Sequence, residues 1–318
     1  MPHRLLILPL LLCSMQAQSD VYPARPIRLV APFPAGGTAD AIARIVANEV
    51  GTGIGQSFVI DNRSGANGII GTDIVAKAPP DGHTLLHVTG SFVINPSIYR
   101  KLPYDIFRDF APVTNVVLGT GYLLLLNPSV HASSVKELVA LAKTQKLTYS
   151  SPGVGNTLHL AAELFNVRSG VKLTHVPYKG VAPAMNAVMS GEVQVTFMPP
   201  TVVVQQVKAG KLKAIAFTGA SRWPVMPELP TMTEAGVKNM ELTGSWHGWF
   251  APAGMPKAVV DRLQREVQRA IQVPKVREFI VEGGYEPDGR SADDFGKFVR
   301  AEFDRYAEMV HIAGVPHQ

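Results

Sequence analysis

The feature that most constrains this sequence is a repeated alternation of short β-rich runs with helical segments. Its first part contains three strand-like runs, at Ile27–Ala31, Ser57–Ile60 and Thr84–Val88, and the segments between them have the apolar spacing of helices. Strands that alternate with helices are typical of a parallel sheet whose faces are covered by helices. We therefore predict an α/β fold for this part of the chain.

The same alternation starts again after a proline-containing interval. The capping-box sequence Ser134-Val-Lys-Glu137 predicts a helix that ends near Lys143. Further helices are expected near residues 157–166 and 181–189, and another between residues 198 and 213. The strands expected in this second α/β unit are Tyr122–Leu126, Leu147–Ser150, Leu173–Val176, Val193–Met198 and Lys213–Phe217.

The last third of the chain links the two units. An apolar, extended segment at Thr243–Phe250 can carry the chain back to the first unit, and helices are expected at Pro256–Gln272, Lys275–Glu282 and Ala292–His311. We predict one lobe from residues 22–122 with 248–318 and a second lobe from residues 123–247. Ligands of open α/β sheets bind at the carboxyl ends of strands, which here border the cleft between the lobes.

The N-terminus has the layout of a secretory signal peptide. Met1–Arg4 is positively charged, Leu5–Leu12 is apolar, and small or polar residues continue to Ala17. The apolar part is shorter than the about 20 residues that a membrane-spanning helix needs. Lipid anchoring at Cys13 is disfavoured, because the bulky Leu12 stands where a small residue is expected. We expect cleavage after residue 17 and free secretion.

Cysteine content and charge exclude several classes of function. Cys13 is the only cysteine, so the mature chain has no disulfide, thiolate zinc site or cysteine nucleophile. The sequence has 30 basic and 25 acidic side chains, and the net charge of +5 is spread thinly. A groove for nucleic acid needs clustered basic and aromatic residues, so we expect no nucleic-acid partner. A mild positive bias suits small anionic ligands.

Three strand-to-helix loops are the candidate binding elements: Pro32–Asp40, Tyr149–His159 and Val176–Gly180. Glycines let the backbone approach a ligand, and the free N–H groups of the following helix favour an anion. If each half of the chain forms one lobe, the first loop faces the other two. The candidate ligand-binding residues are Phe33, Pro34, Ala35, Gly36, Gly37, Thr38, Asp40, Ser91, Ser151, Gly153, Gly155, Asn156, Thr157, His159, Tyr178 and Lys179.

Each of these interpretations has a structural alternative. Glycine-rich turns are also how any parallel α/β fold connects its elements. Asp40 either stabilises the start of its helix or contacts a cationic group of the ligand. His159 either contacts ligand or makes a structural hydrogen bond. Phe33, Phe92 and Tyr178 either stack on an aromatic carboxylate or serve only packing.

Known catalytic and nucleotide motifs are missing. Gly153-Val-Gly155 lacks the third glycine of the dinucleotide fingerprint, and neither a P-loop nor a Gly-x-Ser-x-Gly elbow occurs. His83 and His87 flank a predicted strand, where they would be about 13 Å apart, so we expect no metal site. No cofactor is expected. A hydrolase could draw only on Ser150, Ser151 and His159.

The ordered set of motifs resembles the tripartite tricarboxylate transporter receptors, also called Bug or TctC-like proteins. The resemblance covers nearly the whole mature chain. It rests on the three loops together with Asp61–Gly68, Asp81–Leu85 and Ala182-Pro183-Ala184. Departures from the usual pattern are His83, Asn156 and Asn186, which stand where tyrosine, serine and aspartate are common.

The resemblance implies a two-lobed periplasmic binding-protein fold of type II-like arrangement. It also implies that carboxylates are held through backbone N–H groups, small polar side chains and ordered water. We therefore expect a monomeric periplasmic receptor, not an enzyme, that delivers a di- or tricarboxylate or an aromatic carboxylate to a membrane permease. Presentation of ligand to a two-component sensor, and a periplasmic hydrolase, are the alternatives.

Overall fold

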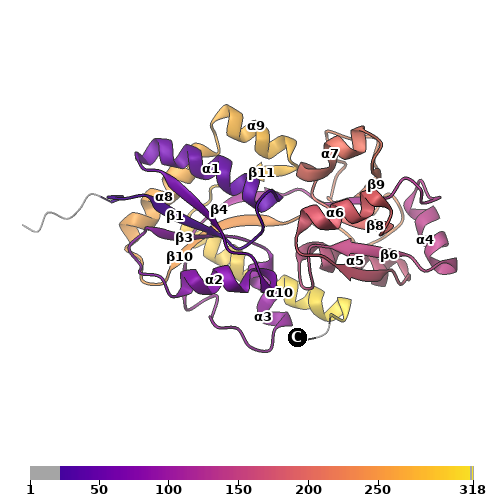
Figure 1. Ribbon diagram of the computed structural model, residues 1–318, viewed down its shortest axis with the longest axis horizontal. Helices are drawn as coiled ribbons and strands as arrows, with labels where there is room; N and C mark the ends of the chain where they lie inside the picture. Colours follow the sequence, from indigo (N-terminus) through magenta and orange to yellow (C-terminus); the bar gives the residue numbers. More distant parts are fainter. Residues whose placement is uncertain (1–21, 316, 318) are drawn as a thin grey trace, which may run out of the picture.

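The structure is a computed structural model that describes residues 22–315 and 317, and it consists of two β-sheets with helices packed around them (Figure 1). The expected signal peptide and Cys13 lie outside the described residues. Within the described part, no helix has the length and apolarity needed to cross a membrane. The two-lobed α/β fold predicted from the sequence is confirmed.

The first sheet has the strand order β11-β4-β10-β3-β1-β2. β1 is parallel to β2 and β3, whereas β10 runs antiparallel between β3 and β4, and β11 is antiparallel to β4. β10 joins this sheet at Trp246, two residues before the predicted lobe boundary at residue 248. The strands are β1 (Ile27–Ala31), β2 (Phe58–Asn62), β3 (Thr84–Thr89), β4 (Phe110–Gly119), β10 (Trp246–Pro252) and β11 (Tyr285–Pro287).

The second sheet has the order β7-β6-β8-β5-β9. β6 is parallel to β7 and β8, and β5 is antiparallel to β8 and β9. All four leucines of β5 are fully buried, which is why this strand is a continuous apolar run with no polar alternation. The strands are β5 (Leu123–Leu126), β6 (Thr148–Ser151), β7 (Thr174–Pro177), β8 (Val195–Met198) and β9 (Lys213–Phe217).

Helices cover both sheets, and the last one contacts both lobes. α10 (Ala292–Ala313) packs against β4 and α3 of the first lobe and against α5 of the second. Around the first sheet lie α1 (Thr38–Ile54), the short 3-10 helix η1 (Ala66–Gly68), α2 (Ile69–Ala76), α3 (Ser91–Ile98), α8 (Lys257–Ala270) and α9 (Pro274–Glu282). Around the second lie α4 (Val135–Thr144), α5 (Thr157–Ser169), α6 (Val181–Ser190) and α7 (Pro200–Lys208).

Most elements predicted from the sequence are confirmed, with ends that shift by a few residues. Four elements were not predicted: η1, α3, β4 and β11. The capping box is only half formed. The Ser134 hydroxyl accepts a hydrogen bond from the Glu137 N–H, but the Glu137 carboxylate accepts from the Ser133 N–H and hydroxyl instead of from Ser134.

Candidate functional site

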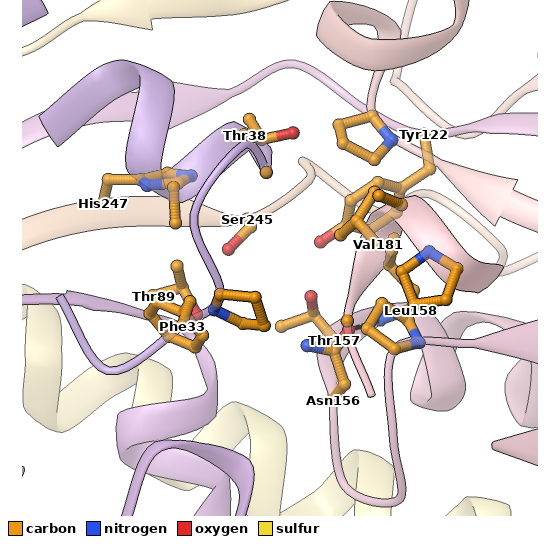
Figure 2. A pocket seen from close by; sticks show the side chains of 18 of the residues that line it. Phe33, Thr38, Thr89, Tyr122, Asn156, Thr157, Leu158, Val181, Ser245 and His247 are labelled. Atoms are coloured by element: carbon orange, nitrogen blue, oxygen red, sulfur yellow. Dashed lines mark hydrogen bonds between the residues drawn. The ribbon is translucent and has the colours of Figure 1, made fainter. Parts of the chain in front are cut away.

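A pocket of about 170 Å³ lies between the two sheets (Figure 2). It is smaller than the about 300–1,000 Å³ of drug-sized sites, so it fits a small molecule. Both lobes contribute to its wall. The lining residues are Phe33, Pro34, Ala35, Gly37, Thr38, Ala39, Thr89, Tyr122, Pro152, Asn156, Thr157, Leu158, Gly180, Val181, Ala182, Pro183, Pro199, Ser245, His247 and Tyr285.

Four helices begin at this pocket. The N-cap residues of α1, α5, α6 and α7 are Gly37, Asn156, Gly180 and Pro199, and all four line it. The first N–H groups of a helix have no partner within the helix, and its N-terminus carries roughly half a positive charge. No side chain caps α1, α6 or α7. The pocket is therefore suited to an anion.

Charged side chains take no part in the wall of this pocket. None of the described lining residues is Asp, Glu, Lys or Arg. The positive potential therefore comes from backbone dipoles, with hydroxyl, amide and imidazole groups beside them. Phe33, Leu158 and Val181 supply apolar surface to the same cavity (Figure 2). Polar donors next to apolar surface suit a ligand with charged ends and a hydrocarbon part.

Two hydroxyl oxygens of the wall are fully shielded from solvent and have no hydrogen-bond partner within the described chain. They are Thr38 Oγ1 and the Tyr122 hydroxyl, and both side chains are buried. Thr157 lies near enough to affect the pKa of Tyr122, but burial dominates and raises that pKa well above its ordinary value. Tyr122 therefore stays protonated. Buried polar groups are nearly always paired, so these two are ready to bind a ligand.

The structure brings together seven of the residues predicted from the loops. They come from the first and second loops, which lie in different lobes and face each other across the cavity: Phe33, Pro34, Ala35, Gly37, Thr38, Asn156 and Thr157. The other predicted site residues do not line the pocket, and each has another place in the structure.

Asp40 holds the first loop and does not face the ligand cavity. Its carboxylate accepts hydrogen bonds from the Gly36 N–H at 3.0 Å, Arg44 Nε at 2.9 Å and Asn62 Nδ2 at 2.9 Å. Burial opposes ionisation of Asp40, but these hydrogen bonds outweigh it and lower the pKa of the carboxyl group. The structural role is thus the one that the geometry supports, and Gly36 belongs to the turn that Asp40 holds.

The second loop is supported from behind by a buried cluster. His159 Nδ1 accepts a hydrogen bond from the Gly155 N–H at 3.2 Å, and its ring stacks on His175 at 4.1 Å. The Ser151 hydroxyl lies 2.6 Å from His175 Nε2. Burial, followed by the neighbouring His175, lowers the pKa of His159 to about 3. Ser151, His159 and the turn residues Gly153 and Gly155 therefore shape this loop.

The remaining predicted residues lie elsewhere. The Tyr178 hydroxyl donates to Glu192 at 2.7 Å, Lys179 is exposed, and Ser91 is buried. Phe92 packs against Phe110 and Phe250 in the core. Of the two alternatives left open for these rings, the geometry supports packing for Phe92 and Tyr178, because among the three only Phe33 lines the pocket.

Several lining residues were missed by sequence reasoning. Thr89 ends β3, Ser245 precedes β10, and His247 is its second residue. All three residues lie where a strand end borders the cleft. The sequence does not reveal this, because it depends on the pairing of β10 with β3. The others are Tyr122 and Tyr285, and the starts of α6 and α7.

The fold and the pocket define a class: a two-lobed binding protein that encloses a small ligand between two α/β lobes. The sequence profile described as "Tripartite tricarboxylate transporter family receptor" matches residues 42–315. The chain belongs to this family.

Relatives and solved structures of the family are similar over nearly the whole chain. The "UPF0065 protein in tcbD-tcbE intergenic region" of Pseudomonas sp. (strain P51) is 38% identical, with 93% of this chain and 89% of the relative covered. The R. palustris protein Rpa4515, solved with adipate, is 36% identical with a TM-score of 0.89, covering 93% of this chain and 100% of the other.

A second ligand-bound structure has the same fold. MatC from Rhodopseudomonas palustris with bound malate is 30% identical, with a TM-score of 0.85, covering 91% of this chain and 100% of that one.

No group of three or more His, Cys, Asp or Glu side chains within residues 22–315 is arranged to hold a metal ion.

Proposed function

We propose that this protein is a periplasmic receptor that captures a small dicarboxylate between its lobes and delivers it to a tripartite tricarboxylate-type permease. The observation that carries the proposal is the meeting of four helix N-termini at a pocket without charged side chains. Periplasmic location is supported by the family and by the sequence of residues 1–17.

A dicarboxylate of four to six carbons is the ligand class that we favour. The pocket is small, and it combines donors from both lobes with apolar surface. Two solved relatives bind such ligands, adipate in one and malate in the other. One carboxylate would bind the first-lobe donors near Thr38 and the other would bind the second-lobe donors near Thr157.

We further propose that the two predicted lobes, residues 22–122 with 248–318 and residues 123–247, move as separate units of a monomer, with Trp246 and His247 moving with the first lobe because β10 joins the first sheet there. The two separate sheets support this division. A hydrolase is disfavoured. Ser151 is fully buried and bonded to His175, and the Ser150 hydroxyl donates to the Ala184 carbonyl, so neither offers a nucleophile to the pocket.

A thermal-shift panel tests the binding function. We expect malate, succinate or adipate to raise the melting temperature, because a ligand that binds only the folded state stabilises it. Phthalate and citrate test the aromatic and tricarboxylate alternatives. If no carboxylate in the panel shifts the melting temperature, the proposal fails.

A matched pair of variants locates the ligand. Ala182 and Asn186 are both exposed on α6, but only Ala182 lines the pocket. Ala182→Phe should fill the cavity and abolish the ligand-induced shift, whereas Asn186→Phe should retain it. A shift that survives in Ala182→Phe would place the ligand elsewhere. Uptake of the labelled ligand by cells with and without the permease separates transport from sensing.

A further inference from the structure

Two histidines and a tryptophan form a buried hydrogen-bonded row that ends at the pocket. In the pairing of β3 with β10, His87 lies opposite Trp249, and Thr89 lies opposite His247. Trp249 Nε1–H donates to His87 Nδ1 at 3.0 Å, and His87 Nε2 lies 3.2 Å from His247 Nδ1. His87 and Trp249 are fully buried, while His247 forms part of the pocket wall.

The row fixes where each imidazole carries its proton. An indole N–H can only donate, so His87 Nδ1 must accept. A neutral imidazole has one donor and one acceptor, so the proton of His87 is on Nε2 and is donated to His247 Nδ1. Burial lowers the pKa of His87 to about 3 and that of His247 well below its usual value, so both are neutral at pH 7. The proton of His247 is then on Nε2.

The Nε2–H of His247 is left for the cavity. Apart from His87, no hydrogen-bond partner of the His247 ring is present in residues 22–315. Ser245 lies two residues earlier on the same face of the chain, and Thr89 is the cross-strand neighbour, so two hydroxyl groups and an imidazole line one side of the pocket (Figure 2). The Ser245 hydroxyl donates to the Trp246 carbonyl at 3.3 Å. The rings of Tyr285 and His247 pack in a T-shaped arrangement, with their centroids 5.3 Å apart.

We propose that His247 contacts the ligand directly as an Nε2–H donor to a carboxylate oxygen, and that Trp249 and His87 set this tautomer. The inference rests on the proposed function and adds a specificity-determining residue to it. His87 and Trp249 are positioning residues because they act only through His247. A donor held in one tautomer favours an oxygen acceptor at this end of the pocket.

Nitrogen NMR of the full chain labelled with ¹⁵N-histidine reads the tautomer directly. Without ligand, we expect His247 to show a protonated Nε2 and an unprotonated Nδ1. On addition of adipate, used as the probe, the Nε2 resonance should move. Trp249→Phe removes the first donor of the row, so His247 should populate both tautomers and bind adipate roughly 2- to 10-fold more weakly.

Affinities of pocket variants for adipate complete the test. His247→Phe should weaken binding roughly 10- to 100-fold, because it removes a buried hydrogen bond to a charged group. His247→Gln keeps an N–H donor and should bind within a few-fold of the wild type, which also covers the case in which the Phe variant fails to fold. His131→Phe, at an exposed position outside the pocket, is the control and should bind normally.

The outcomes separate this inference from the proposed function. If the wild type binds adipate but His247 carries its proton on Nδ1, or its Nε2 resonance does not move, the inference is wrong and the receptor function stands. If His247→Phe binds adipate as tightly as the wild type, the inference is likewise wrong and the receptor function stands. If the wild type binds neither adipate nor malate, the proposed function fails and the ligand role of His247 fails with it.

Discussion

Tyr122 has a hydroxyl group that should lower the stability of the ligand-free protein and raise its affinity for ligand. Its ring is buried, but its hydroxyl has no hydrogen-bond partner of good geometry in the described chain. A buried hydroxyl without a partner costs the folded protein about 1–3 kcal/mol. The same hydroxyl faces the pocket, where it can donate a hydrogen bond to a carboxylate oxygen.

Replacing Tyr122 with Phe should therefore have effects of opposite sign. We expect the ligand-free variant to be as stable as the wild type or up to about 1 kcal/mol more stable, because the unpaired group is gone. Dicarboxylate affinity should fall about tenfold. Urea unfolding and calorimetric titration measure the two effects. A variant that loses stability but keeps its affinity would show that the hydroxyl has a structural partner.

Asp40 has the contrasting role, because its contacts are all within the protein. Its carboxylate joins the turn at Gly36 to Arg44 on α1 and to Asn62 at the end of β2. The carboxyl group has a lowered pKa, since these hydrogen bonds outweigh its burial. A lowered carboxyl pKa stabilises the fold above the unfolded value near 4, and that stabilisation is lost as the pH falls through the folded value.

Asp40→Asn should thus destabilise the protein by about 1–3 kcal/mol at pH 7. The difference from the wild type should shrink as the pH falls below about 4, because the unfolded carboxyl then binds a proton, and it should disappear only below the lowered pKa of the folded state. Urea unfolding at both pH values measures this. Asp261→Asn is the control, because Asp261 forms an exposed ion pair with Lys257 and should change stability by less than about 1 kcal/mol. An equal loss for both variants would contradict the role of Asp40.

Among the elements, the loops that begin α1 and α6 approach each other across the cleft. Gly180, the N-cap of α6, has φ +121°, and a Cβ atom there would lie 3.1 Å from Cγ of Pro34 in the first loop. Any other residue would therefore be strained and would press on the opposite lobe. Close approach of these two loops depends on glycine at this position.

Gly180→Ala should weaken dicarboxylate binding about tenfold or more, because closing the lobes would then cost strain and a steric contact. Gly210→Ala is the matched control. Gly210 also has a positive φ, of +69°, but a Cβ atom there would meet nothing within 4 Å. Both variants should lose stability, and only Gly180→Ala should lose affinity. Similar affinities for the two variants would contradict the closure argument.

The elements that sequence reasoning missed are those in which tertiary structure overrides local signals. α3 contains Pro96, which normally breaks a helix. β4 contains Pro112 although it lies between β10 and β11, and a register shift between Trp249 and Phe250 accommodates it. Proline in a central strand argues against a strand, so the sequence does not indicate β4.

The candidate site was predictable only where a single loop carries its own signal. Thr38 and Thr157 follow glycine-rich or polar turns at helix starts, so the sequence indicates them. Ser245 and His247 reach the pocket because β10 returns to the first sheet beside β3, a long-range pairing that no local pattern encodes. Asp40 and His159 carried an ambiguous signal, since a polar residue at a helix start suits both a ligand and a structural hydrogen bond.

At the scale of the whole molecule, three buried histidines and the half-buried His175 make stability depend on pH. Burial lowers the pKa of His87 and His159 to about 3, that of His175 to about 4, and that of His247 well below its ordinary value. In the unfolded chain a histidine has a pKa near 6.5. Below that pH these histidines bind protons in the unfolded state but stay neutral in the folded state. The free energy of unfolding therefore falls as the pH falls.

We expect the free energy of unfolding to decrease steeply between pH 6.5 and about pH 4.5. Each histidine contributes up to about 1.4 kcal/mol per pH unit in this window. The slope of the unfolding free energy against pH should therefore approach the value expected when about four protons are bound on unfolding. Urea unfolding at half-unit pH steps measures the slope. An uptake of less than about one proton would contradict the neutral state assigned to these side chains.

Recognition of an anion by backbone donors, without a cationic side chain, is the central claim, and one calorimetric titration tests it most directly. The purified mature chain is titrated with adipate and with adipamide, which has the same carbon chain but no charge. The account predicts one adipate bound per chain with a dissociation constant near micromolar or tighter, about −8 kcal/mol or more favourable, and no measurable binding of adipamide. Equal affinity for the two compounds, or binding of adipamide alone, would contradict it.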